Sequence, residues 1–267
     1  SVLPEPAGAC TMKERAGSSA ASRALASGRE LRSAMAIKLY DLVGAEDDRR
    51  FSPNCWRTAM ALKHKGLEFV SVPWRFTERE AIAFSGQGLV PVIVDGGQTV
   101  HDSWNIALYL EEAYPQRPAL FEGGQSQALT FFFQQWVFRA IHSATLKVIA
   151  LDVFARLHEK DKAYFRESRE KRFGITLEKY AGDPNASLAA FRGALEPVRP
   201  VLVQQPFVSG KGPGYADYLL FGPFMWARAM SPVRMLEPDD PVFAWRERLL
   251  DLWGGYARSA KGFPVWA

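Results

Sequence analysis

The chain has few of the residues from which metal centres and disulfide frameworks are built. Its 267 residues include two cysteines and four scattered histidines. Two cysteines exclude a disulfide framework and favour a reducing compartment, so we expect a cytoplasmic protein. The histidines share no metal-ligand spacing. We therefore expect neither a metal site nor a bound cofactor.

Long apolar runs and clustered positive charge are also missing. No uncharged apolar run approaches the roughly 18 residues that suggest a membrane span. The formal net charge of +4 is small, and basic residues are interleaved with acidic ones, which excludes the basic stripe of a nucleic-acid-binding protein. We expect no membrane and no nucleic acid among the partners. The 48% of hydrophobic residues is typical of a globular protein with an ample core.

Residues 1–34 differ in composition from the rest of the chain. They are rich in Ala, Ser, Gly and Arg and lack apolar periodicity, which predicts a disordered N-terminal extension. They also lack the apolar segment of a secretory signal. We take Met35 as the natural start and exclude this extension from the fold.

Residues 35–117 show the pattern of a small α/β domain. The segment "AIKLYDL" alternates like a strand, a helix begins at Ser52, and "LEFVSVPW" indicates a second strand. The segment "VPVIVDGGQTVHD" predicts a hairpin that turns at Gly96-Gly97, and a helix follows from about Ser103 to Ala113. Strand, helix, strand, hairpin and helix together indicate an α/β layer structure.

The Pro/Gly-rich "YPQRPALFEGG" is typical of a linker, and residues 126–267 then predict an all-helical domain. We expect helices within 126–158, 159–180, 187–205, 215–231 and 241–259. The fourth segment, "YADYLLFGPFMWARAMS", is apolar along almost its whole length. A helix that is apolar all round lies inside a bundle.

The stretch "FSPNCWRTAMALKHKG" (51–66) indicates a helix that begins at a chemical site. Ser52 suits the N-cap, Pro53 the first turn and Gly66 the C′ position. The spacing from Ser52 to Cys55 is that of a C-P-x-C redox motif with serine in place of the first cysteine. Without a C-x-x-C pair, we favour a buried structural Cys55 over a resolving thiol. We expect Trp56 and Arg57 to serve packing and ion pairing.

Three segments carry a resemblance to the glutathione transferases. They are "SPNCWRTAMALKHKG", "VPVIVDGG" and "HDSWNIALYLEEAYP", in the order and at the separations of that family. The Ser-x-x-x-Trp-Arg pattern is similar to its serine-type classes. Together with the late "EPDDPVFAW", the segments look most like the β-etherase-type enzymes of bacteria and fungi. The resemblance implies a thioredoxin-like N-terminal domain and an all-α C-terminal domain.

The resemblance also implies a set of site residues. Ser52 would be catalytic, donating a hydrogen bond to the glutathione thiolate at a helix N-terminus. Glutathione, a cosubstrate rather than a cofactor, would lie against the residues Asn54, Val90, Pro91, Asp102 and Ser103. The Val90-Pro91 bond corresponds to the cis-proline of the family. Simple helix capping is an equal alternative for Asp102 and Ser103.

The second substrate implied by the resemblance is a small aromatic electrophile, and β-aryl ether cleavage is one such reaction. Its pocket would lie between the domains, with Phe51, Phe132, Phe133, Trp136 and Phe138 as candidate lining residues. Core or dimer contact is an equal interpretation of these aromatic residues. The resemblance further implies a homodimer.

Other functions remain open at this stage. A non-catalytic ligand-binding protein would use the same fold, and a thiol–disulfide reductase would depend on Cys55. Maleylacetoacetate isomerases share Ser-x-x-x-Trp-Arg, but Pro53 replaces their second serine. One further departure concerns the last long apolar helix, where Asp217 is present but Gly214 stands at the N-cap in place of Ser or Thr.

Overall fold

The computed structural model of the chain describes residues 36–264. The extension predicted over residues 1–34 lies outside the described residues. No helix within 36–264 combines the length and the apolar character that crossing a membrane would require.

A mixed four-stranded sheet forms the first layer. Its strands are β1 (Ile37–Leu42), β2 (Phe69–Trp74), β3 (Val92–Asp95) and β4 (Gln98–His101), in the spatial order β2-β1-β3-β4. Strands β1 and β2 are parallel, whereas β3 is antiparallel to both β1 and β4. The β3–β4 turn is Gly96-Gly97, and both glycines have the positive φ that such a turn requires. The predicted hairpin is confirmed.

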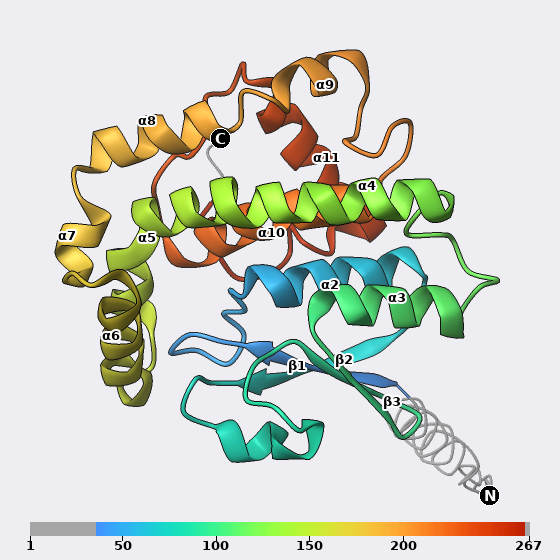
Figure 1. Cartoon of the computed structure of the whole chain (residues 1–267), viewed down its shortest axis with the longest axis horizontal. Helices are drawn as coiled ribbons and strands as arrows, with labels where there is room; N and C mark the ends of the chain where they lie inside the picture. Colours follow the sequence, from blue (N-terminus) through green and yellow to red (C-terminus); the bar gives the residue numbers. More distant parts are fainter. Residues whose placement is uncertain (1–35, 265–267) are drawn as a thin grey trace, which may run out of the picture. The chain divides into compact units, whose positions relative to one another are not determined.

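Two helices cover one face of the sheet. Helices α2 (Pro53–His64) and α3 (Ser103–Ala113) lie between the sheet and the helical layer, and the short 3₁₀ helix η1 (Arg79–Ser85) lies on the opposite face (Figure 1). The buried Lys65, which follows α2, pairs with Glu111 of α3 at 2.6 Å. This thioredoxin-like arrangement, followed by a helical domain, confirms the predicted fold class. The boundaries at 117 and 126 stay predictions, because residues from Ile37 on form one compact unit.

Helices form the second layer. In chain order they are α4 (Gly123–Trp136), η2 (Val137–His142), α5 (Ser143–Arg156), α6 (Glu159–Phe173), α7 (Leu177–Ala181), α8 (Pro184–Ala194), α9 (Arg199–Gln204), α10 (Tyr215–Met230) and α11 (Pro241–Gly255). Single helices over 159–180 and 187–205 were wrong expectations. Gly174, with φ of 72°, ends α6, and Thr176 caps a new helix, α7. Pro197 and Pro200 interrupt the second segment, where Pro cannot continue a helical hydrogen-bond ladder.

The segment η2 is a single π-turn within an otherwise continuous α4–α5 helix. A π-turn takes more residues per turn than the 3.6 of an α-helix. Residues four apart across this junction therefore stay on one side of the helix. Gln134 and Phe138 are such a pair, and both line the same hollow.

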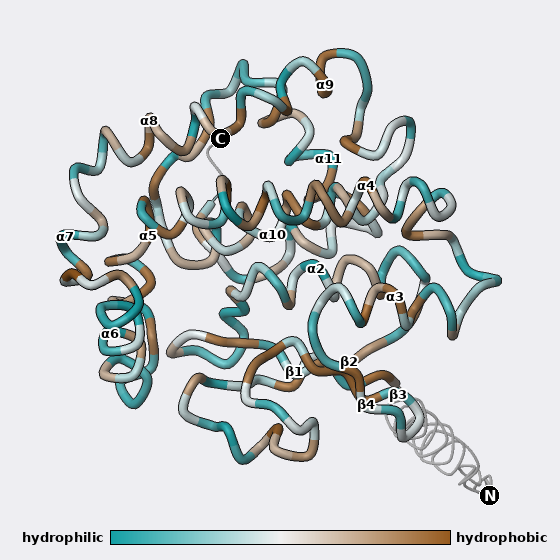
Figure 2. The backbone as a smooth tube through the Cα atoms, viewed as in Figure 1, coloured by the Kyte–Doolittle hydropathy of each residue, from teal (hydrophilic) through white to brown (hydrophobic). Residues whose placement is uncertain are grey.

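Helix α10 is buried along nearly its whole length, as its composition predicts. Figure 2 shows apolar residues along α10 and the central strands, whereas α6 is largely hydrophilic. Helix α10 packs most closely on the first turn of α2. A Cβ at Gly222 would lie 2.4 Å from the carbonyl oxygen of Pro53. Only glycine allows the two backbones to approach this far.

The glycine at the N-cap of α10 has a steric cause. A Cβ at Gly214 would lie 2.6 Å from Oγ of Ser209, so a serine or threonine does not fit there. The carboxylate of Asp217 still accepts a hydrogen bond from the Gly214 N–H at 3.0 Å. The hydrogen bond from the N-cap N–H to Asp217, one of the two bonds of a capping box, is therefore present. The glycine at position 214, which departs from the usual Ser or Thr, is explained by its close packing against Ser209.

The substitution Gly222→Ala tests how strongly this contact supports the fold. The added methyl group requires α10 and the start of α2 to separate, and overpacking of this kind typically costs about 1–3 kcal/mol. In a protein of this size, that lowers Tm by roughly 2–6 °C. Calorimetry or circular dichroism measures the change.

Gly193→Ala is the matched control. Gly193 is an exposed residue inside α8, and a Cβ there would contact nothing within 4 Å. Alanine favours a helix over glycine by about 1 kcal/mol, so Tm should stay or rise. Equal Tm values for the two variants would show that the Gly222–Pro53 approach is not a constraint.

Candidate functional site

The N-terminus of α2 is formed as its sequence predicts. Ser52 is the N-cap, and its hydroxyl oxygen accepts a hydrogen bond from the Cys55 N–H at 3.2 Å. Pro53 occupies the first turn, and Gly66 follows the helix with φ of 64°. The Ser52 hydroxyl also lies within hydrogen-bonding reach of the Cys55 thiol, which is the one side-chain neighbour found for it within residues 36–264.

The N-terminus of α3 is held in an unusual backbone conformation. Asp102 is its N-cap and has φ of 70°, and its carboxylate accepts from the Trp104 and Asn105 N–H groups at 2.9 and 3.1 Å. The capping interpretation of Asp102 is therefore confirmed. A non-glycine residue at positive φ costs about 1–3 kcal/mol and is typical of ligand sites. Ser103 opens the helix, and its carbonyl accepts from the Tyr215 hydroxyl at 2.6 Å.

The N-termini of α2 and α3 border one pocket of about 420 Å³. Five of the predicted glutathione residues line it, namely Asn54, Val90, Pro91, Asp102 and Ser103. The Val90-Pro91 peptide bond is cis. The Val90 N–H and C=O make no hydrogen bond to another described residue. The pocket volume suits a small molecule with several polar groups.

Ser52 lies beside this pocket rather than in its lining. Only 4% of the residue is exposed, whereas Asn54, two positions further on, lines the pocket. The role of Ser52 stays a prediction.

Arg57 is a pocket residue that the sequence interpretation missed. Its side chain is buried, and only Nη1 has a partner, the Asn54 Oδ1 at 2.8 Å. Its Nε and Nη2 are buried without a hydrogen-bond partner within residues 36–264, and no ion pair forms there. Burial lowers the pKa of Arg57, but a guanidinium stays charged. The expected ion pair was wrong, and the Asn54–Arg57 spacing of three residues on one helix face was the available signal.

The predicted electrophile residues do not come together around this pocket. Phe51 is 2% exposed and packs edge-on against Phe76 in the core. Phe132 and Phe133 line a separate hollow of about 600 Å³ between α4 and the 208–216 segment. Trp136 packs against Phe133, with ring centroids 5.2 Å apart. Of the aromatic candidates, Phe138 lines the Asp102–Ser103 pocket, together with Gln134 and Gln135.

Cys55 faces away from the pocket into a buried polar cluster. The residue is wholly buried, and its Sγ lies 3.8 Å from the Tyr40 carbonyl. Burial and the neighbouring Asp41 raise the pKa of this thiol well above its usual range. Asp41 itself pairs with Nε of Arg50 at 2.8 Å. These surroundings fit the structural interpretation of Cys55.

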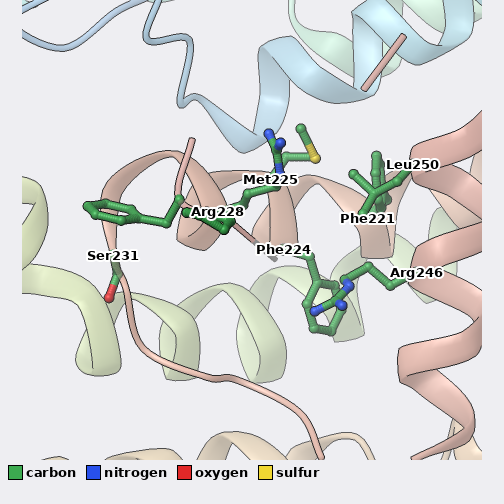
Figure 3. A pocket seen from close by; sticks show the side chains of 9 residues that line it. Phe221, Phe224, Met225, Arg228, Ser231, Arg246 and Leu250 are labelled. Atoms are coloured by element: carbon green, nitrogen blue, oxygen red, sulfur yellow. The ribbon is translucent and has the colours of Figure 1, made fainter. Parts of the chain in front are cut away.

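Two further features bear on the choice of site. A cavity of about 10 Å³ inside the helical layer is lined by Phe221, Phe224, Arg228 and Arg246 among others (Figure 3). It has room for about one water molecule and no larger ligand.

Within the described part of the chain, no three His, Cys, Asp or Glu residues are grouped to hold a metal ion.

Comparison with known proteins agrees with this geometry. The sequence profile of "Glutathione S-transferase, N-terminal domain" matches residues 51–113, and that of "Glutathione S-transferase, C-terminal domain" matches residues 128–238. A zeta-class glutathione S-transferase of Euphorbia esula is 37% identical over 76 residues, 26% of this chain and 34% of that protein. The matches to curated relatives of this kind span about a third of their length.

Fungal structures resemble the whole fold. The glutathione transferase GSTFuA3 of Phanerochaete chrysosporium has a TM-score of 0.67 at 25% identity, over 82% of this chain and 92% of that one. CsGST63524 of Ceriporiopsis subvermispora, solved in complex with glutathione, has the same TM-score and coverage at 24% identity. The fold, the two helix N-termini around one pocket and the two domain profiles show that this chain belongs to the glutathione S-transferase family.

Proposed function

We propose that the protein is a glutathione transferase that activates the glutathione thiol for attack on an aromatic electrophile. One observation carries this proposal. Five residues chosen from three separate sequence segments line a single pocket at the N-termini of α2 and α3. The low cysteine content supports a reducing, cytoplasmic setting.

The γ-glutamyl end of glutathione is assigned to the N-terminus of α3. The Ser103 hydroxyl and the Ser103 N–H suit a carboxylate, since Asp102 already accepts from the Trp104, Asn105 and Ile106 N–H groups. The exposed Asp102 carboxylate can meet the ammonium group while it caps the helix. Arg57 adds a buried positive charge to the same pocket, and its unpartnered Nη2 can hold a carboxylate oxygen.

The cysteinyl part of glutathione is assigned to Val90, whose free backbone N–H and C=O can pair with it as a neighbouring strand would. This places the thiol towards the start of α2. There the helix dipole and the Ser52 hydroxyl both favour a thiolate. Lowering the thiol pKa by two units requires about 2.7 kcal/mol, and one hydrogen bond to a charged group contributes about 1.5–3 kcal/mol.

The thiolate would then attack the aromatic substrate. With a β-aryl ether, the sulfur forms a bond to the ether carbon, the C–O bond breaks, and the phenolate leaves with the electron pair. The resemblance of the three sequence segments to β-etherase-type enzymes supports this substrate class, and similarity to CsGST63524, solved in complex with glutathione, supports the glutathione site. The zeta-class relative supports a second candidate, a maleylacetoacetate-type isomerase, over the 76 matched residues. Pro53 in place of the second serine weighs against it.

A reductase function is weakly supported, because Cys55 is buried with a raised pKa. In a Cys10→Ser background, we expect a disulfide reagent such as DTNB to leave Cys55 unmodified in the native protein at pH 8 and to modify it after denaturation. The raised pKa keeps the group as a thiol, which is a poor nucleophile. Modification of the native protein within minutes would favour the reductase interpretation.

The role of Ser52 is tested by the thiolate absorbance of the glutathione complex as a function of pH. Ser52→Ala should raise the pKa of the bound thiol by about one unit or more and lower kcat at pH 7 about tenfold. The mutant thiol is then less ionised at neutral pH and recovers as pH rises.

Ser103→Ala and Asn54→Ala are the matched controls. Ser103→Ala should raise KM for glutathione roughly ten- to a hundredfold while the thiol pKa stays unchanged, because the γ-glutamyl end is remote from the sulfur. A shift caused by Asn54→Ala but not by Ser52→Ala would transfer the donor role to Asn54 and leave Ser52 as a helix cap.

We further propose that the enzyme is a homodimer whose contact includes the outer face of α4. Leu129 and Phe132 on this face are 71% and 73% exposed, and large apolar side chains so close together typically mark an interface. Phe131, which packs on Trp104 of α3 at 5.0 Å between ring centroids, extends the apolar face.

Sedimentation tests this interface. The wild type should behave as twice the 29.9 kDa chain mass, and a Leu129→Glu/Phe132→Glu variant as a monomer, because burying two carboxylates in an apolar contact is strongly unfavourable. Val203→Glu is the control, since Val203 is equally exposed at 72% but belongs to another helix, α9. Dissociation by the control, or a dimeric double mutant, would place the interface elsewhere.

A further inference from the structure

Helix α11 ends in a strained turn that brings Tyr256 to α2 and β2. Trp253, Gly254 and Gly255 have φ of 51°, 69° and 77°. A bulky residue such as tryptophan rarely adopts positive φ, because this conformation costs free energy and persists only where the surrounding structure requires it. We call residues 256–263, which follow the turn, the C-terminal strap.

Tyr256 contacts residues on both sides of Ser52 in the chain. Its hydroxyl oxygen accepts a hydrogen bond from Nη1 of Arg50 at 2.9 Å, and its ring packs against Trp56 at 5.9 Å between centroids. Arg50 and Trp56 also contact each other, since the Arg50 carbonyl accepts from Trp56 Nε1 at 3.1 Å and the guanidinium lies 4.4 Å from the indole centroid. Tyr256 therefore joins the end of the β1–α2 loop to the first turn of α2.

Lys261 of the strap holds the exposed part of the same loop. Its Nζ pairs with Glu46 Oε1 and with Asp48 Oδ1, both at 3.0 Å. With Arg50, three of the five consecutive charged residues 46–50 thus contact the strap. An ion pair at the surface contributes little by itself. The strap holds the loop through the set of contacts, of which the Tyr256 hydrogen bond is the most buried.

The strap itself is fixed by the buried helix α10. Arg228 donates from Nη1 and Nη2 to the carbonyls of Ala260 and Arg258, both at 2.7 Å. The Arg228 carbonyl accepts from the Phe263 N–H at 2.8 Å. A Cβ at Gly262 would lie 2.8 Å from that carbonyl oxygen, so the two backbones are in direct contact. Through the strap, α10 therefore determines the position of an exposed loop.

We propose that Tyr256 and Lys261 are positioning residues, which hold the β1–α2 loop so that the Ser52 hydroxyl can donate to the thiolate of bound glutathione. This inference rests on the proposed function and adds the C-terminal strap to the site. A hydrogen bond weakens steeply as its angle departs from linearity, so a small displacement of Ser52 reduces this donation. Glutathione affinity depends mainly on the separate segment 90–103 and should change little.

Tyr256→Phe and Lys261→Gln, combined in one variant, test the inference. Tyr256→Phe removes the acceptor of the Arg50 hydrogen bond but keeps the ring. With glutathione and 4-nitrobenzyl chloride at pH 7, kcat should fall about threefold or more, but no further than in Ser52→Ala, and KM for glutathione should change less than about twofold. In this reaction the thiolate sulfur bonds to the benzylic carbon, and chloride leaves with the electron pair.

Two further readouts need no turnover. The thiolate absorbance of the glutathione complex should titrate at a higher pH in the combined variant than in the wild type. Amide hydrogen exchange of residues 44–50 should be about threefold faster or more, because the loop opens locally without its strap contacts. Lys261→Gln alone, at a surface side chain, covers the case in which the Tyr256 variant does not fold, and exchange of residues 46–48 should still be faster in it.

The same changes in a Ser52→Ala background show whether the strap acts through Ser52. A positioning effect on kcat should vanish there, because the hydroxyl that it orients is gone, whereas a general loosening of the fold would lower kcat equally in both backgrounds.

Arg166→Gln is the matched control for Lys261→Gln. Arg166 pairs with Glu170 at 3.0 Å and with Glu178 at 2.9 Å, so this variant also removes a cation that bridges two carboxylates. It should leave kcat and the thiolate titration unchanged, whatever its effect on Tm.

The outcomes separate this inference from the proposed function. If Ser52→Ala raises the thiol pKa but the combined variant does not, or if the loss of kcat persists in the Ser52→Ala background, the strap inference is wrong and the transferase proposal stands. Unchanged exchange of the loop, or an equal effect of Arg166→Gln, also contradicts it. If glutathione does not bind the wild type at millimolar concentration, both are overturned.

Discussion

Helix α10 and the first turn of α2 approach each other so closely at Gly222 that no side chain fits between them. This contact joins the helical layer to α2, the helix whose N-terminus carries Ser52 and Asn54. Because α10 is buried along nearly all of its length, its position is fixed by the packing of the helical layer around it. The start of α2, with Ser52 and Asn54, is therefore held in place by the whole helical layer as well as by the sheet.

The N-terminus of α10 is fixed by a single side chain, that of Asp217. The Asp217 carboxylate is fully buried and accepts hydrogen bonds from Val208 N–H, Ser209 N–H, Gly214 N–H and Trp245 Nε1. A buried carboxylate is tolerated only when its oxygens are satisfied in this way. One acidic residue thus fixes the 208–214 loop, the start of α10 and the packing of α11. Tyr215, which follows the cap, then reaches the Ser103 carbonyl and links this frame to the α3 side of the pocket.

Features that depend on neighbouring residues in the chain could be predicted from the sequence. The Ser52 cap, the Gly66 end, the Gly96-Gly97 turn and the burial of α10 all follow from local pattern, and the structure has each of them. Features that depend on partners distant in the chain could not. Phe51 and Phe132 are equally apolar, yet tertiary packing buries the first and leaves the second exposed. The π-turn, for its part, has no signature in composition.

Arg50 and Arg57 show why charge was the hardest property to predict. Arg50 pairs with the buried Asp41 at 2.8 Å and lies over the Trp56 ring at 4.4 Å. Arg50 thus compensates most of the charge of the buried Asp41. Arg57 is buried in the pocket with no acidic partner within the described residues, and leaving a buried charge uncompensated costs several kcal/mol. In the proposed function, the γ-glutamyl carboxylate of glutathione would offset this cost on binding. Arg50 is therefore neutralised within the chain, whereas Arg57 depends on a ligand for an ionic partner in that proposal.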